Sequence, residues 1–243
     1  SPVVEIDTPP ISFDDCVEKI SEKRGELDDY MTQLFQVLED FLDKYKHLGA
    51  VLGLDPVEYT HDFDPKGTKT LDEYKIALTE FHKVLDVVQN EIDTEYKLNF
   101  FHLSCKEFKE KNSQHINTLI HNFLHQIKDF AMQSIIELKE EFESIQEELQ
   151  KVPQTPEELA KMKKYLENVF ETVKTRNKKM AISNERFQFL EDFHFEVSNE
   201  EFQLRYQTLQ MPQKISMIMD ETERTLSVER IRMIRELRAN QRK

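Results

Sequence analysis

Three histidines have the spacing closest to that of a metal site in this chain. His121 and His125 are separated by one helical turn, and His115 lies shortly before them. Two imidazoles on one face of a helix can chelate zinc. Zinc proteases with this spacing carry a Glu directly after the first His, which is missing here, and no third ligand is evident. We therefore expect these histidines to lie on a solvated helix face.

A run of carboxylates is the second candidate for metal chemistry. It consists of Glu140, Glu141, Glu143, Glu147 and Glu148. Di-iron helical bundles combine such glutamates with Glu-x-x-His motifs, and the sequence contains no such motif. We interpret the run as a charged helix face. A helical-bundle metalloenzyme remains the third of three functional hypotheses, with no catalytic residue, cofactor or metal ligand predicted.

The two cysteines, Cys16 and Cys105, are far apart in sequence and lack a Cys-x-x-Cys spacing. Reduced thiols are expected, and a single disulfide between them is the alternative. No phosphate-binding loop is present either, because the chain has neither a G-x-G-x-x-G nor a Walker A motif. The sequence therefore contains no recognisable catalytic signature.

The composition favours helices as the elements that position all these residues. Among 243 residues, Gly occurs four times and Pro eight times, far below average usage. Charged residues make up 33%, yet 17 Phe and 7 Tyr are too many for a disordered chain. We predict an all-α protein, an elongated bundle of about five long antiparallel helices with heptad-like seams.

The net charge argues against nucleic acid as a partner, and the distribution of apolar residues argues against membrane insertion. At −14, the chain would be repelled by nucleic acid over most of its surface. No apolar run reaches the 18 residues of a membrane-spanning helix. We expect neither nucleic-acid binding nor membrane insertion.

Residues 1–103 are predicted to form an extended segment, 1–12, and a helical hairpin, 13–103. The first helix, 13–48, carries a seam of apolar residues at alternating three- and four-residue steps. A long connection over 49–69 follows, with one helical turn expected near Val57. The second helix begins at the capping box Thr70-x-x-Glu73 and ends near Leu98. A single unbroken helix over 71–151 is the alternative.

Residues 104–243 are predicted to form a C-terminal helical bundle. Its first helix begins at Ser104-x-x-Glu107 and runs to about 151, with a stutter of the seam at Ser134. The next runs from Pro156, capped by Thr155, to about Phe195. Ser198-x-x-Glu201 caps the last helix, which must kink or restart at Pro212.

The end of the last helix reverses the sign of the overall charge. Arg230, Arg232, Arg235 and Arg238 form a basic tail, which is the candidate partner-facing site. It can pair with Glu-rich faces of the same chain, or dock an acidic partner or a neighbouring segment of a parent chain. A membrane-surface role is the third alternative, weakened by the lack of a strong Trp or Phe face.

The order of features along the last three predicted helices resembles a known family. A long helix ends at Pro-Gln-Thr-Pro-Glu-Glu-Leu, residues 153–159, and Tyr165 follows. Then come Phe-Gln-Phe-Leu-Glu-Asp-Phe, residues 187–193, Ser-Asn-Glu-Glu from Ser198, and a Pro-x-x-Ile step at 212–215. This pattern resembles the stem of an axonemal dynein heavy chain just before its linker, more closely over 100–243 than over 1–99.

The resemblance implies a non-catalytic scaffold within a microtubule motor of cilia and flagella. ATP hydrolysis and microtubule binding would lie outside this chain. The partners implied are dynein intermediate and light chains and neighbouring heavy-chain segments, in the cytoplasm and the ciliary axoneme, with a single-headed inner arm favoured. Because the chain begins at Ser1 without an initiator Met, we expect a segment of a longer protein.

A second hypothesis is a stand-alone adaptor of the spectrin-like or tethering type. Such a protein binds a partner helix in a groove between its own helices. Surface charge in the sequence does not separate a partner-binding face from a solvated one.

Overall fold

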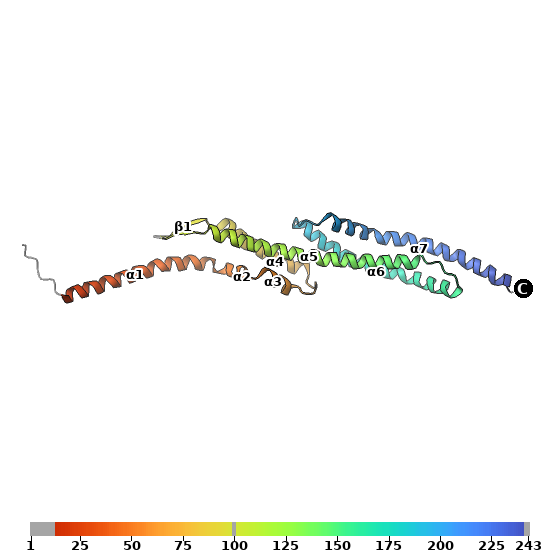
Figure 1. Ribbon diagram of the computed structural model, residues 1–243, viewed down its shortest axis with the longest axis horizontal. Helices are drawn as coiled ribbons and strands as arrows, with labels where there is room; N and C mark the ends of the chain where they lie inside the picture. Colours follow the sequence, from red (N-terminus) through yellow and green to blue (C-terminus); the bar gives the residue numbers. More distant parts are fainter. Residues whose placement is uncertain (1–12, 99–100, 241–243) are drawn as a thin grey trace, which may run out of the picture. The chain divides into compact units, whose positions relative to one another are not determined.

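The computed structural model describes residues 13–98 and 101–240, and this part of the chain is mostly helical (Figure 1). The predicted extended segment 1–12 lies outside the described residues. The first elements are α1 (Phe13–Tyr45), the 3₁₀ turn η1 (Lys46–Leu48), α2 (Gly49–Leu52), α3 (Pro56–Phe63), α4 (Leu71–Asp86) and the π-helical turn η2 (Val87–Glu91). They are followed by β1 (Glu95–Leu98), β2 (Phe101–Ser104), α5 (Lys106–Leu149), α6 (Pro156–Asp192) and α7 (Asn199–Asn240).

The contacts divide the chain into two compact units. The first unit contains the residues up to Pro56 together with Thr79–Leu119. The second contains Val57–Leu78 and the residues from Ile120 onward. The division falls within α4 and α5, so it does not coincide with the 103/104 boundary drawn from the sequence. An unbroken helix over 71–151 is also excluded, because η2 and two strands separate α4 from α5.

A small antiparallel hairpin in the first unit, formed by β1 and β2, replaces the predicted helix end near Leu98 and the predicted helix start at Ser104. Its register pairs Glu95 with Ser104 and Leu98 with Phe101. Ser104 was expected to cap the next helix, but it belongs to β2 and α5 begins two residues later. Residues 101–104 satisfy their backbone groups by pairing with residues 95–98 just before them, and this pairing competes with a local helix cap at Ser104.

The hairpin holds the second half of α1. The ring of Phe41 meets the ring of Tyr96 edge-on at 4.7 Å, and the hydroxyls of Tyr45 and Tyr96 lie 3.3 Å apart. The Asp93 amide donates to the Tyr96 hydroxyl at 2.8 Å, which fixes that ring in turn. Burial, followed by the contact with Tyr45, raises the pKa of Tyr96, so the phenol stays neutral and remains a hydrogen-bonding group.

The predicted 49–69 connection is an ordered excursion: it contains α2 and α3, and its part from Val57 onward belongs to the second unit. The Asp64 side chain, which is 2% exposed, accepts hydrogen bonds from the Thr68 and Lys69 amides at 2.9 and 3.2 Å. The Tyr74 hydroxyl lies 3.1 Å from Asp64 Oδ2 and 2.8 Å from Gln126 Oε1. The Gln126 amide donates to the Thr60 carbonyl at 3.0 Å. This network fastens the excursion to α4 and α5.

The core of the second unit lies between α5, α6 and α7, which pack as long antiparallel helices. It combines one stripe from each helix: Leu138, Phe142, Ile145 and Leu149 of α5, Val169 and Met180 of α6, and Met211 and Ile215 of α7. At the predicted stutter, Ser134 is half-buried while Ala131 and Ile135 are fully buried. The shift of the seam therefore moves the core to the neighbouring helical positions without leaving a gap in it.

Three of the predicted helix starts are confirmed in atomic detail. Thr155 Oγ1 accepts from the Glu158 amide at 3.2 Å. The Ser198 amide donates to Glu201 and the Glu201 amide donates back to Ser198 Oγ, which completes a capping box. The Thr70–Glu73 box has the same reciprocal bonds. The bond from the Thr70 amide to the Glu73 carboxylate, together with those from the Lys69 and Thr70 side chains, lowers the pKa of Glu73 from 4.5 to about 2.

The structure excludes one of the two alternatives predicted at Pro212 and moves the predicted end of α6. Pro212 lies inside α7, which continues through it without a restart, because Met211 and Ile215 are both held in the core. A proline there removes one backbone bond, and burial of its neighbours offsets that loss. α6 ends at Asp192 rather than near Phe195, and His194, within the range predicted for this helix, is exposed with a φ of 54°.

Candidate interaction surfaces

The histidines on α5 do not form a metal site. The rings of His121 and His125 have centroids 6.0 Å apart, and His125 Nδ1 lies 3.0 Å from an oxygen of Asp129. Across the described ranges 13–98 and 101–240, no three His, Cys, Asp or Glu side chains are grouped closely enough to hold a metal ion. His121 instead contacts the ring of Phe195.

The glutamate run on α5 forms ion pairs on the helix surface. Glu141 pairs with Arg176 and lies 3.9 Å from Lys179, so it connects α5 to α6. Glu143 pairs with Lys139 one turn away at 3.7 Å. Glu148 pairs with Lys151 beyond the end of the helix. These contacts agree with the predicted charged face.

Both cysteines are free thiols, so the disulfide alternative does not hold. Cys16 is half-exposed on α1, and Cys105 is buried before α5. Burial raises the pKa of the Cys105 thiol, and nearby Lys109 lowers it to a smaller extent. A raised pKa keeps the thiol protonated and unreactive, which fits a packing role.

The basic tail lies on the exposed C-terminal part of α7. Arg232 donates to Glu229 at 2.6 Å and to Glu236 at 3.1 Å, and these bonds raise the pKa of its guanidinium. Arg230, Arg235 and Arg238 are exposed. The ion pairs of Arg232 are therefore formed within α7 itself and not with a glutamate-rich face of α5.

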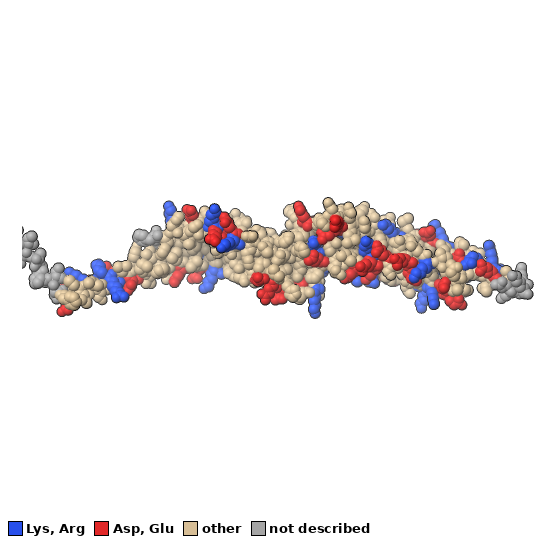
Figure 2. Space-filling view, viewed as in Figure 1, with Lys and Arg blue, Asp and Glu red and all other residues tan. Residues whose placement is uncertain are grey.

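Charged side chains are interspersed along the surface of the helices (Figure 2). On the visible face of the second unit, Asp and Glu gather with Lys and Arg between them, as expected for a solvated surface. None of the helices in the described part of the chain has the length and apolar character needed to cross a membrane.

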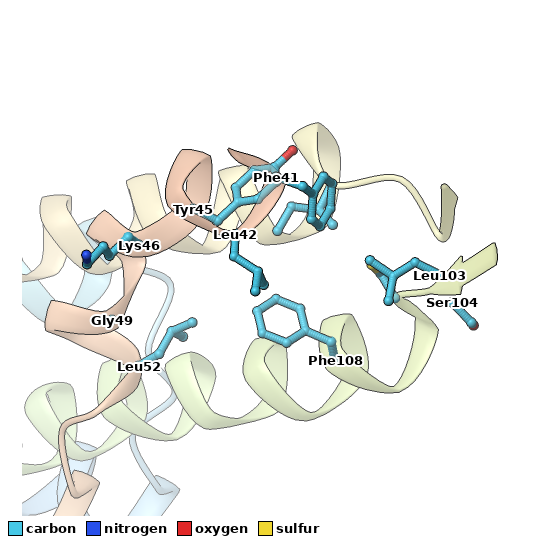
Figure 3. A pocket seen from close by; sticks show the side chains of 11 residues that line it. Phe41, Leu42, Tyr45, Lys46, Gly49, Leu52, Leu103, Ser104 and Phe108 are labelled. Atoms are coloured by element: carbon cyan, nitrogen blue, oxygen red, sulfur yellow. The ribbon is translucent and has the colours of Figure 1, made fainter. Parts of the chain in front are cut away.

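An apolar groove in the first unit was not predicted from the sequence. Its volume is about 360 Å³. One wall comes from α1, η1 and α2: Phe41, Leu42, Tyr45, Lys46, Gly49 and Leu52. The other residues that line it are Ile92 after η2, Leu103 and Ser104 of β2, Cys105, and Phe108 of α5. In Figure 3 the side chains of Leu42 and Phe108 point toward each other across the groove. Both side chains are exposed, at 65% and 42%.

The chemistry of the groove suits an apolar side chain. Its walls are mostly aliphatic and aromatic, and the polar groups on its lining are the Lys46 ammonium, the Ser104 hydroxyl and the Tyr45 hydroxyl. Sequence reasoning missed it because Leu42 and Phe108 lie outside the seams of their helices. The one available signal was that both are large apolar residues off the periodic stripe, at positions where a surface helix usually carries polar side chains.

The first half of α1 is a second exposed apolar surface. Val17, Ile20, Leu27 and Met31 of the predicted seam are exposed, as is Phe13 one turn before it, whereas Leu34 and Leu48 farther along the seam are buried. Figure 1 shows this part of α1 beyond the end of the hairpin, with no other element of the unit alongside. The predicted seam is thus packed only where the hairpin and α2 meet it.

A scan against models of protein families found no match, and a search of curated proteins found no significantly similar sequence.

Proposed function

We propose that this chain is a non-catalytic stem segment of an axonemal dynein heavy chain. The observation that carries the proposal is the ordered set of features from 153 to 215, each of which falls at a defined structural position. The Pro-Gln-Thr-Pro-Glu-Glu-Leu sequence makes the capped turn between α5 and α6. Ser198-Asn-Glu-Glu starts α7 with a capping box, and the Pro-x-x-Ile step places Ile215 in the core.

In this proposal the segment is a mechanical and assembly scaffold in microtubule-based movement. Helices α5, α6 and α7 share one core, so a load along them is distributed over many side-chain contacts at once. Isolated helices of this kind are marginally stable, and packing supplies their stiffness. The segment would anchor the motor and lead into its force-transmitting linker, while ATP hydrolysis and microtubule contact belong to other parts of the parent.

The proposed partners are the intermediate and light chains of the dynein and neighbouring segments of the heavy chain. The basic tail at Arg230, Arg235 and Arg238 is the surface proposed for an acidic segment of this kind. The proposed location is the axoneme of a cilium or flagellum, in the cytoskeletal fraction of the cytoplasm.

An antibody raised against this chain tests the proposal. Immunoblots of isolated axonemes from the source cells should reveal the epitope in one polypeptide many times larger than 29.0 kDa. High salt should release it, and on a density gradient it should sediment together with ATPase activity. An epitope confined to a polypeptide of about the size of this chain, or sedimenting apart from ATPase activity, would contradict the stem assignment.

The apolar groove favours the second candidate, a helical adaptor that binds a partner helix. A groove of this type receives one or two large apolar side chains from an amphipathic helix. Leu42→Asp and Phe108→Asp would close it to such a partner, since each introduces a charge at its mouth. If the adaptor hypothesis holds, these variants lose their partner on affinity capture while Val57→Asp, at a similarly exposed apolar site, retains it. Retention of the partner by both groove variants would count against the adaptor.

A further inference from the structure

The exposed half of α1 has the sequence of one strand of a coiled coil. Assigning Val17, Arg24 and Met31 to a positions places Phe13, Ile20 and Leu27 at d positions. The two remaining less polar side chains of this stretch, Cys16 and Tyr30, both fall at flanking g positions. The outer b, c and f positions are occupied by polar residues and Gly25. The five apolar seam residues are nevertheless exposed in the described structure.

We infer that this face pairs with the same face of a second copy, as a parallel two-stranded coiled coil over residues 13–31. The seam of the same helix is covered farther along by the hairpin, which shows that it is a packing face and not a solvated one. A two-fold dimer requires a self-complementary surface, and the charges beside the seam decide whether α1 supplies one. This inference goes beyond the proposed function and rests on α1 alone; in a dynein stem it would join two heavy chains, so a dimer would speak against the single-headed type.

The flanking charges favour the parallel arrangement. In a parallel pair each g residue faces the e residue five positions later on the partner helix. Lys23 then faces Asp28 of the second copy, twice by symmetry, and Cys16 faces Ser21. In the free chain Lys23 pairs with Glu26 at 2.5 Å, but both side chains are exposed, so exchanging that partner costs little.

The same charges oppose the antiparallel arrangement of this stretch. The register that sets Val17 against Leu27 also sets Lys23 against its own copy. It brings Asp14 against Asp28 as well, so both flanks carry like charges. Like charges at these positions are destabilising, and they act here as a selection against the reversed orientation.

Arg24 is the one seam residue that opposes close association. In the parallel pair it faces its own copy at an a position, beside Lys23 of the partner. Its aliphatic stem can pack in the seam while the guanidinium reaches outward toward Asp28, four residues later on its own helix. Polar residues at a single a position fix the register at a cost in affinity. We therefore expect a reversible dimer that is strengthened by Arg24→Leu.

Sedimentation equilibrium of the full 243-residue chain over a concentration series tests the association. The wild type should show a reversible monomer–dimer equilibrium. Ile20→Ser should weaken it at least about tenfold, because a large apolar side chain no longer enters the seam. Ile76→Ser is the matched control, since Ile20 and Ile76 are 68% and 71% exposed and the chemical change is identical. Both variants should unfold at the wild-type temperature.

Cross-linking separates the parallel arrangement from its alternatives. In a Cys16→Ser background, Leu27→Cys should form an intermolecular disulfide on mild oxidation, because d residues of a parallel pair face each other. Three results would overturn the inference: a monomer at every concentration, a dimer that survives Ile20→Ser, or a dimer in which Leu27→Cys couples only to Val17→Cys. The last result would indicate antiparallel helices.

Discussion

The hydroxyl of Thr222 lies 2.9 Å from the main-chain oxygen of Leu149. Leu149 is the last residue of α5, where carbonyl groups have no partner inside the helix. Thr222, in the middle of α7, is buried and also lies 2.8 Å from the Ile218 carbonyl of its own helix. One side chain therefore satisfies the end of a helix that is 73 residues away in sequence.

Replacing this threonine by valine should weaken the second unit. Thr222→Val keeps the shape and leaves the buried Leu149 oxygen without its donor, at a cost of about 1–3 kcal/mol in the free energy of unfolding. Thr225→Val is the control, because Thr225 bonds only to the Glu221 carbonyl of its own helix. Urea unfolding followed by circular dichroism measures both, and equal effects would show that the link to α5 contributes nothing.

Three alanine substitutions should reduce the free energy of unfolding in the order in which the replaced side chains are buried. Phe123 is fully buried among Tyr59, Phe63 and Tyr74, and Phe123→Ala should cost about 3–5 kcal/mol.

Leu166→Ala should cost less than Phe123→Ala, since Leu166 is only partly buried against the core. Phe170 of α6 is 63% exposed, so Phe170→Ala should change the free energy of unfolding by no more than about 0.5 kcal/mol. Thermal or urea unfolding of the three variants checks the order. Any other ranking would contradict the assigned packing of α5 and α6.

The stability of the α5–α7 contact should fall in acid. Burial opposes ionisation of Glu201, but Lys128 at 2.9 Å and Ser198 hold the pKa of this carboxyl below its ordinary value of 4.5. Its contribution is therefore present above pH 4.5 and is lost as pH falls through the depressed folded-state pKa.

Glu201→Gln should flatten this acid dependence while retaining the capping bond that a Gln can also make. The measurement is the free energy of unfolding as a function of pH. The exposed neighbour Glu200 provides the control. In Glu200→Gln the free energy of unfolding should fall in acid as steeply as in the wild type. If Glu201→Gln were equally steep, the Lys128 contact would not be a source of acid sensitivity.

Two glycines should respond to alanine with opposite signs. Gly67 has a φ of +66°, and a Cβ there would lie 2.9 Å from Cδ1 of Phe130. Its carbonyl also accepts a bond from Arg186 at 3.1 Å. Gly67→Ala should therefore destabilise the second unit by about 1–3 kcal/mol, as seen by thermal unfolding.

Gly25 lies within α1, and a Cβ there would meet no atom within 4 Å. Gly25→Ala should stabilise this part of the helix by about 0.5–1 kcal/mol because the unfolded chain has less freedom to lose. Amide hydrogen exchange over 17–31 reports the change locally. Faster exchange in the variant would mean that the glycine is needed there for another reason.

Local signals in the sequence determined where α4, α6 and α7 begin. The caps at Thr70, Thr155 and Ser198 act over three or four residues, so no distant contact is needed to form them. The three-four spacing of apolar residues likewise identified the buried stripes of α4, α5 and α6, since one helix face must leave water.

Only the tertiary structure decided which part of each stripe is covered and by what. Ser104 has the signature of a cap but pairs with Glu95 in a hairpin, because strand pairing offered its backbone a nonlocal partner. The seam of α1 is uniform in sequence, yet Tyr96 covers it at Phe41 and leaves Ile20 exposed. The groove between Leu42 and Phe108 likewise arises only because the fold brings α1 and α5 together. Periodicity shows that a face is apolar, whereas its partner depends on where distant residues are brought by the fold.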